Sequence, residues 1–535
     1  MKQRVYIFTL MLLVAVSAVF VAEARPRVVV NIVVSGLRQS DMSRYEKNFS
    51  KDGFMRLRSN GVEYTECYAE YAPTTSEAGL ATLATGTLPA THGIFSKVLF
   101  DRTANKESYL TYLPQSDNTA VVKMSVESDR TVQSFIAPTL SEAVLNASER
   151  NRVVTIAHNS LSAMIMAGRK GECYWLSDAG KWTSADCYMA ELPAWVATCN
   201  SNDMNKVFAT DTWYGRYTSD RYLNKLFTDI LIYEKNSTKR VRSSKKPSGE
   251  WVKRMRVSPS GNLAIFEFAK SALVSMLPLQ GEDECKVVNI CLDVPRAVAE
   301  KYGSDSIEYE DMLYSLDGAL AEFLTFLYAQ IPSKEDVVVL LTSDGGMSPT
   351  KQENGDATRF NTRQFEVIIN AFLSARYGQD AWVLGYADGS LYLNHEVIYR
   401  HKKSVEEVQN EAATFALQYR GVASAVAATA LRSAQFTKGA LALVQNGYNP
   451  RRSGDVLIAL DAERIEFDPY RVAMSGSVYS YDRHIPLIIS GATIEPHKVS
   501  VRVSSEQVAP SVAALLGVER PYCSDSEILT FENRK

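Results

Sequence analysis

The chain has 535 residues, of which 46% are hydrophobic, 22% charged and 10% aromatic. These ordinary fractions exclude a collagen-like fibre, a disordered chain and a multi-span membrane protein, and a formal net charge of −3 gives no basic excess that would indicate nucleic acid as a partner. Only six residues are histidine, which is few for a large enzyme that uses metal ions.

The first 24 residues have the features of a secretory signal peptide. Lys2 and Arg4 form a positive start, an apolar run extends from Val5 to Val21, and an A-x-A cleavage site ends at Ala24. The alternative is an uncleaved anchor, although the run is short for a membrane span. We therefore expect a periplasmic or secreted mature chain over residues 25–535, with no transmembrane segment after cleavage.

Short apolar runs rich in β-branched residues predict buried strands of a parallel sheet. In chain order they are Arg27–Val34, Arg152–Ile156, Lys286–Leu292, Asp336–Thr342 and His484–Ser490. The apolar spacing over Ser306–Leu327 predicts an amphipathic helix between two of them. This alternation predicts an α/β fold, whose ligands bind in the loops after Val34, Leu292 and Thr342.

Two stretches look like additions to this core. Residues 170–285, rich in Trp, Tyr and polar residues, predict a cap insertion. It contains the basic run 239–256, which is either a solvated loop or a patch for an anionic ligand. Residues 380–465 predict a small α+β subdomain.

Motifs spread over the chain resemble those of the alkaline phosphatase superfamily. They are VVSGLR at 33–38, YAPTTSEAGLATLATGTLPATHGI at 71–94, LLTSDGG at 340–346, GYNPRRSGD at 447–455 and YSYDRHIPLIISG at 479–491. The likeness is greatest to the type I phosphodiesterase/nucleotide pyrophosphatase branch, and within it to bacterial phosphate-irrepressible alkaline phosphatases. It implies a mostly parallel sheet between helix layers, with a cap and a small subdomain.

The resemblance also implies roles for particular residues. In that family a Thr or Ser attacks phosphorus between two zinc ions, and Ser76 stands at this nucleophile position. A helix N-cap is the alternative role for Ser76, because Glu77 and a helical run follow it. Lys97 stands where an Asn contacts the phosphate. Asp344 and His484 match two zinc-ligand positions, which belong to different zinc sites.

The remaining ligand positions of the family have other residues in this chain. They carry Ser35, Arg296, Glu300 and Gly345. A serine brings no negative charge, and a guanidinium places a fixed positive charge where a dication would lie. We expect Arg296 to pair with Glu300.

Two further acids could replace lost ligands, and one pair of substrate contacts is missing. Asp41 and Asp293 are the possible displaced ligands. Asn159 and Leu161 stand where related phosphomonoesterases carry a Lys-x-Arg pair that grips the phosphate, and neither replaces its charge.

These substitutions leave two hypotheses. The first is a pseudophosphatase without a cofactor, which acts as a binding or scaffold protein for an envelope protein or an anionic ligand. The second is an active phosphomonoesterase or phosphodiesterase that uses Ser76 and zinc with rearranged ligands. An Arg296 guanidinium within reach of Asp344 or Glu300 would leave no room for a cation. Convergence of Ser76, Asp344, His484 and a third carboxylate would favour the enzyme.

Overall fold

The computed structural model describes residues 25–101, 106–109, 121–122, 137–202, 213–224, 231–232, 251–279, 281, 284–331, 333–350, 359–491 and 494–531. The predicted signal peptide and residues 239–250 of the basic run lie outside this part of the chain. Within it, no helix combines the length and the apolar character that crossing a membrane requires.

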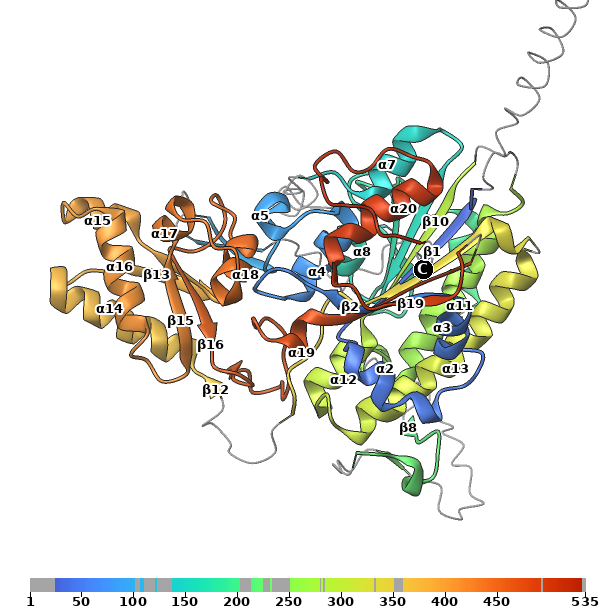
Figure 1. The fold of residues 1–535 in the computed structure, drawn as a ribbon, viewed down its shortest axis with the longest axis horizontal. Coiled ribbons are helices and arrows are strands. Elements are labelled where there is room, and N and C mark those ends of the chain that lie inside the picture. Colours follow the sequence, from blue (N-terminus) through green and yellow to red (C-terminus); the bar gives the residue numbers. More distant parts are fainter. Residues whose placement is uncertain are drawn as a thin grey trace, which may run out of the picture.

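A ten-stranded mixed sheet forms the centre of the molecule (Figure 1). Its strand order is β19-β2-β18-β11-β1-β10-β5-β6-β7, with β20 paired to β2. The strands are β1 Val28–Val34, β2 Gly61–Tyr68, β5 Arg152–Ala157, β6 Glu172–Leu176, β7 Trp182–Thr183, β10 Lys286–Leu292, β11 Val337–Thr342, β18 His484–Gly491, β19 His497–Val499 and β20 Val503–Ser504. Each strand predicted from the sequence is present in this sheet.

The predicted direction is correct for four of those strands and wrong for one. The neighbours β11, β1, β10 and β5 run parallel, but β18 is antiparallel to both β11 and β2. A buried apolar run does not encode strand direction, because both kinds of buried strand can have the same composition. The carboxyl ends of β1, β10 and β11 meet at one edge, where Val34 lies opposite Leu292 and Val33 opposite Thr342.

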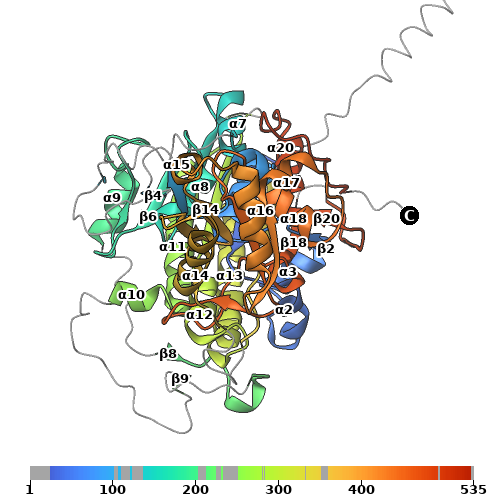
Figure 2. The same ribbon diagram turned by 90° about the vertical axis from the view of Figure 1, so that its left-hand side faces the viewer.

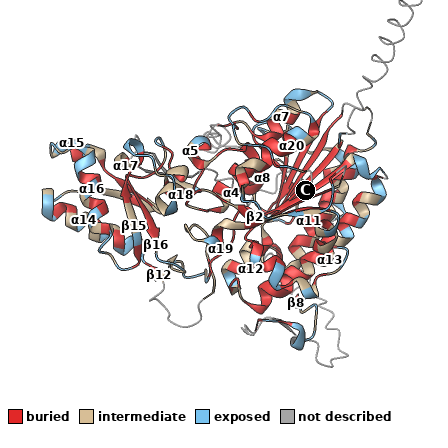
Figure 3. Cartoon of the chain, in the orientation of Figure 1, coloured by how far each residue is buried: buried red, intermediate tan, exposed pale blue. Residues whose placement is uncertain are grey.

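Alternate residues of β1 are buried in two cores, one on each face of the sheet. Val30 and Ile32 belong to the first core, and Val29 and Val33 to the second. The first face is covered by α2 Gln39–Arg44, α3 Phe54–Ser59, α9 Ala194–Ser201, α10 Trp251–Met255, α11 Pro259–Met276, α12 Val294–Tyr302 and α13 Ile307–Gln330, and the second by α4 Ser76–Thr85, α7 Leu140–Ala147, α8 Ser160–Ala167 and α20 Val508–Leu516. Figure 3 shows the buried sheet between these layers.

The helix predicted over Ser306–Leu327 is α13, and it extends to Gln330. Ser306 caps it by accepting a hydrogen bond from the N–H of Tyr309 at 3.1 Å. Both the expected α/β class and the helix layers are therefore confirmed.

A smaller sheet with its own core forms a subdomain beside the main body (Figures 1 and 2). Its order is β13 Val383–Ala387, β14 Ser390–Leu393, β16 Val456–Leu460 and β15 Val422–Ala427. Its helices are α14 Thr362–Tyr377, α15 His395–Arg400, α16 Val405–Ala416, α17 Ala428–Ser433 and α18 Gly439–Gly447. Because Phe365 and Ile369 of α14 pack in the same core, this unit begins before residue 380.

The stretch 170–285 does not form a single insertion. Strands β6 and β7 extend the main sheet, and α11 packs against its first face. The aromatic residues that suggested a cap are partly core residues, since Trp182 is fully buried and stacks on Phe268 with ring centroids 4.0 Å apart.

Short elements connect these units. They are η1 Glu46–Asn48, α5 Pro89–His92, β3 Val98–Asp101, β4 Lys106–Tyr109, β8 Trp213–Tyr214, η3 Ser219–Arg221, β9 Leu231–Ile232, η4 Lys334–Asp336, β12 Arg359–Phe360, β17 Ile465–Glu466, α19 Ser480–Arg483 and η6 Ser505–Gln507.

Candidate functional site

The carboxyl ends of β1 and β11 bring Ser35 and Asp344 together. Ser35 follows β1 directly, and Asp344 lies two residues beyond β11, its parallel neighbour. The Ser35 hydroxyl donates a hydrogen bond to Oδ2 of Asp344 at 2.5 Å, and the N–H of Gly36 donates to Oδ1 at 3.2 Å. The loop edge predicted for chemistry therefore gathers around one buried carboxylate.

Helix α4 adds Ser76 to this cluster, where its hydroxyl donates to Oδ2 of Asp344. The helix approaches this closely because of Gly79: a Cβ atom there would lie 1.7 Å from the Asp344 carbonyl oxygen. The N-cap of α4 is Thr75, whose Oγ1 accepts a hydrogen bond from the N–H of Ala78 at 3.2 Å. The capping interpretation of Ser76 is thus wrong, and its hydroxyl instead faces the carboxylate.

Arg296 of α12 forms a buried ion pair with Asp344. Its Nη2 lies 2.9 Å from Oδ1, and the exposed fractions of the two side chains are 12% for Arg296 and 0% for Asp344. Nη1 donates to Oγ of Ser475 at 2.5 Å. Burial opposes the charge on Arg296, but Asp344 and Glu300 outweigh it and raise the pKa of the guanidinium above its usual range. Arg296 therefore stays protonated and neutralises the carboxylate.

The groups around Asp344 are not a set of zinc ligands. Zinc binds three or four Cys, His, Asp or Glu side chains, whereas the partners of Asp344 are hydroxyls, a backbone N–H and a guanidinium. Among the described residues, no group of three or more His, Cys, Asp or Glu side chains could hold a metal ion. Gly345, at a family histidine position, has φ of +151°, which side-chain-bearing residues rarely adopt.

His484 and Lys97 lie outside the Asp344 cluster. His484 opens β18, where its ring hydrogen-bonds to the Thr65 carbonyl at 2.8 Å and stacks on Tyr68 with centroids 4.4 Å apart. Lys97 is exposed and precedes β3. Its positive charge opposes the rise that burial and Asp388 cause in the pKa of Glu77. The structure thus brings together Ser76 and Asp344 among the predicted site residues, without His484 or Lys97.

The expected partner of Arg296 and one displaced ligand are engaged elsewhere. Glu300 pairs with Arg471 at 3.4 Å rather than with Arg296. Asp41 pairs with Arg38 at 2.8 Å and accepts a hydrogen bond from the Tyr309 hydroxyl at 3.1 Å.

Asp293 holds the start of α8. It accepts hydrogen bonds from the N–H groups of His158 at 3.1 Å and Asn159 at 3.3 Å, and from the Ser162 hydroxyl at 2.7 Å. Burial raises the pKa of Asp293 to about 6. Asn159 is the N-cap of α8, so this stretch is built for helix capping.

Sequence reasoning missed Ser475 as a partner of Arg296. It lies in a run of small and polar residues, which carries no pattern that distinguishes it from an ordinary loop. The approach of this loop to α12 depends on tertiary packing alone.

The fold and the site at its strand ends define an alkaline-phosphatase-like protein. The model of the family "Type I phosphodiesterase / nucleotide pyrophosphatase" matches residues 29–465, and the chain belongs to this family, within the alkaline phosphatase superfamily. The crystal structure of wild-type alkaline phosphatase PafA superimposes with a TM-score of 0.82, at 21% identity, covering 94% of this chain and 98% of that one.

Curated relatives are similar over nearly the whole chain. A protein of Myroides odoratus named calcium-transporting ATPase is 26% identical over 519 residues, covering 93% of each chain. Alkaline phosphatase PhoV of Synechococcus elongatus is 26% identical, covering 95% of this chain and 93% of its own. Alkaline phosphatase PafA of Elizabethkingia meningoseptica is 24% identical, covering 94% of this chain and 93% of its own.

Proposed function

We propose that this chain is an exported, non-catalytic member of its family, a pseudophosphatase that acts as a binding or scaffold protein of the cell envelope. The observation that carries the proposal is the buried pair between Arg296 and Asp344. The guanidinium supplies the positive charge that Asp344 would otherwise find in a metal ion, so the site is complete without a cofactor.

The energetics favour this arrangement over metal binding. A dication at Asp344 would lie beside a buried guanidinium that remains charged, and this like-charge contact is unfavourable in a region of low dielectric constant. Expelling Arg296 would also break its hydrogen bond to Ser475. A metal would thus have to displace interactions that the folded chain already makes.

The proposed export and partners rest on the sequence alone. The signal peptide pattern over residues 1–24 supports a periplasmic or secreted location. The partner would be an envelope protein or an anionic ligand. For an anion, the exposed Lys97, whose charge acts on Glu77 of α4, is one candidate point charge.

The alternative is a phosphoric ester hydrolase that uses Ser76, and one contact favours it. The Ser76 hydroxyl donates to Asp344, the geometry in which a carboxylate can accept a proton from a nucleophile. The same carboxylate is paired with Arg296, however, so it already serves as the counter-ion of a buried guanidinium.

Turnover measurements distinguish the two functions. The purified mature chain, supplied with zinc, is assayed with p-nitrophenyl phosphate and bis(p-nitrophenyl) phosphate, beside PafA as a positive control and Ser76→Ala as a matched blank. We expect wild type and variant to give the same background rate. Turnover that Ser76→Ala abolishes would overturn the proposal and establish the hydrolase.

A further inference from the structure

Two cysteines lie at one edge of the main sheet, in and beside the β6–β7 hairpin. Cys173 is the second residue of β6, and Cys187 lies in the turn that follows β7. Cys173 is fully buried and Cys187 is exposed, and the structure holds both as thiols. Whether they can form a disulfide bond depends on how the hairpin places them.

The pairing of β6 with β7 directs the chain after β7 toward Cys173. Trp175 lies opposite Thr183 in this antiparallel pair. Continuing the register by two residues along each strand places Ala185 opposite Cys173. The side chains of Cys173 and Ala185 belong to the same core, so they point to the same face of the sheet. Cys187 therefore follows two residues after the position that faces Cys173.

A turn then holds the chain against the start of β6. The carbonyl of Ala185 accepts a hydrogen bond from the N–H of Tyr188 at 3.0 Å. The Tyr188 hydroxyl donates to the carbonyl of Gly168 at 2.8 Å, and Gly168 precedes β6 in the chain. Because Tyr188 reaches the segment that leads into β6, its neighbour Cys187 is held near the beginning of that strand.

The two thiols are close enough to act on each other electrostatically. Burial raises the pKa of the Cys173 thiol well above its usual range, and Cys187 adds to this rise. Burial and both cysteines likewise raise the pKa of the Tyr188 hydroxyl, which also hydrogen-bonds with Cys173. This mutual effect agrees with the position of Cys187 that the hairpin and the turn define.

The other buried cysteines are too far from Cys173 to pair with it. Cys291 lies on β10 and Cys285 directly before it, and β5 separates this strand from β6. Neighbouring strands are about 4.8 Å apart, so β10 and β6 are about 9.6 Å apart, whereas the Cα atoms of a disulfide are about 4.4–6.8 Å apart. Cys67 lies on β2, which is farther away in the same sheet. Cys199 packs in the core on the opposite face.

We propose that Cys173 and Cys187 form a disulfide bond in the exported chain. The bond closes a loop over residues 173–187 and ties the turn after β7, an edge strand of the main sheet, to β6. The inference rests on the proposed export, because disulfides persist in an oxidising compartment. It does not depend on whether the Asp344 cluster is catalytic, so the turnover assay and a disulfide analysis succeed or fail independently.

The bond forms by exchange with a disulfide oxidant, such as oxidised glutathione or an oxidised dithiol protein. The thiolate of the exposed Cys187 attacks one sulfur of the oxidant, and the other sulfur leaves as a thiolate. The thiolate of Cys173 then attacks Sγ of Cys187 and releases the second thiolate of the oxidant. Two protons and two electrons thus pass from the cysteines to the oxidant, which ends as two thiols. Because burial disfavours the thiolate of Cys173, this second step belongs to folding, before β6 is covered.

Peptide mapping without reduction tests the pairing directly. The mature chain is sent to a bacterial periplasm by an unrelated signal sequence, so the outcome does not depend on its own residues 1–24. Thiols are blocked with N-ethylmaleimide under denaturing conditions, and the tryptic peptides are analysed by mass spectrometry. We expect peptides 171–181 and 182–206 as one linked species that reductant separates. Recovery of Cys173 as its maleimide adduct in most chains would overturn the proposal.

Matched cysteine variants locate the bond. Cys187→Ser should abolish the linked species, whereas Cys199→Ser, which changes the other cysteine of peptide 182–206, should leave it intact. Cys523→Ser is a second control, because Cys523 is also exposed. A link that survives in Cys187→Ser, or that is lost in either control, would overturn the assignment. Mapping of the wild-type chain needs no variant, so a variant that fails to fold does not prevent the test.

Discussion

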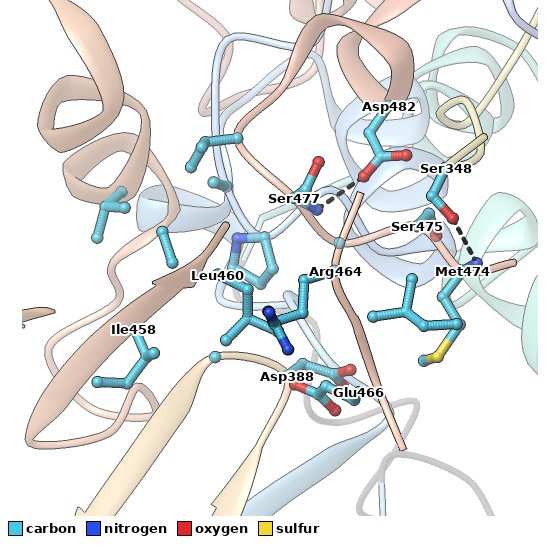
Figure 4. A pocket seen from close by; sticks show the side chains of 18 of the residues that line it. Ser348, Asp388, Ile458, Leu460, Arg464, Glu466, Met474, Ser475, Ser477 and Asp482 are labelled. Atoms are coloured by element: carbon cyan, nitrogen blue, oxygen red, sulfur yellow. Dashed lines mark hydrogen bonds between the residues drawn. The ribbon is translucent and has the colours of Figure 1, made fainter. Parts of the chain in front are cut away.

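The Asp344 cluster and the cavity lined by Asp388, Glu466 and Asp482 (Figure 4), here called the acidic cavity, both hold carboxylates in protected positions. The negative charge is compensated differently in the two. Asp344 receives hydrogen bonds from Ser35, Ser76 and Gly36, and an ion pair from Arg296. In the cavity, Asp482 keeps an oxygen without a partner among the described residues, and Asp388 faces Glu466. The first site is therefore balanced by an ion pair, whereas in the second the raised pKa of Glu466 means that a proton reduces the negative charge.

The largest effect should follow from removing the positive charge of the balanced site. Arg296→Met leaves Asp344 buried without its counter-ion and should lower the free energy of unfolding by about 3–5 kcal/mol. Urea denaturation measures the loss. Arg471→Met is the control, because its pair with Glu300 is 31% exposed on the arginine side and should contribute about 0–1 kcal/mol. Similar small losses in both variants would mean that Asp344 does not depend on Arg296.

A smaller change in the free energy of unfolding, of opposite sign, is expected when Glu466 of the acidic cavity is substituted. The pKa of Glu466 is raised from 4.5 to about 8, so the folded chain retains a proton that the unfolded chain loses. Stability should therefore fall as the pH rises from 4.5 to 8. Glu466→Gln removes this part of the pH-dependent loss of stability. The variant should have a free energy of unfolding about 1–3 kcal/mol higher than wild type near pH 8.

Thermal unfolding over that pH range measures the effect of Glu466→Gln. The exposed Glu406→Gln is the control and should leave the pH profile unchanged. A Gln variant whose profile matches wild type would show that Glu466 is not held in a desolvated acidic environment.

Ser76→Ala should have a modest effect on stability. The carboxylate of Asp344 keeps its other donors, so the loss should be about 0.5–1.5 kcal/mol, as for a typical hydrogen bond. Ser35→Ala removes the other hydroxyl from the same oxygen and should cost a similar amount. A loss near that of Arg296→Met would imply that Ser76 has a structural role beyond this bond.

The smallest effect is expected at Lys97. Lys97→Ala should change the free energy of unfolding by less than about 0.5 kcal/mol, because the side chain is exposed. If Lys97 binds an anion, inorganic phosphate should raise the melting temperature of the wild type slightly and not that of the variant. A phosphate shift that survives in Lys97→Ala would place the anion elsewhere.

The core was predictable because each strand is short, apolar and β-branched. Val28–Val34 is buried along its whole length, so the printed residues alone indicate a strand covered on both faces. The reversal of β18 was not predictable, since direction depends on the connections and not on the residues. The composition of 170–285 led to the wrong prediction of a single cap insertion. Trp and Tyr occur both in buried cores and in cap insertions, so composition alone does not distinguish them.

The site was predictable where it follows a motif. Ser76 and Asp344 lie at the matched positions and make contact, and the Arg296–Asp344 pair is one of the geometries that the substitutions anticipate. Glu300 was the wrong partner because α12 directs it toward Arg471. The acidic cavity was missed because Asp388, Glu466 and Asp482 come from separate segments, and each alone resembles an ordinary surface acid.

Zinc content tests the central claim most directly. The purified mature chain is dialysed against zinc, freed of loosely bound metal, and analysed for zinc per chain, with PafA treated in parallel. If Arg296 takes the place of a metal, the chain retains far less than one zinc ion, and Arg296→Met does not by itself restore binding. Retention of two zinc ions per wild-type chain would contradict the account.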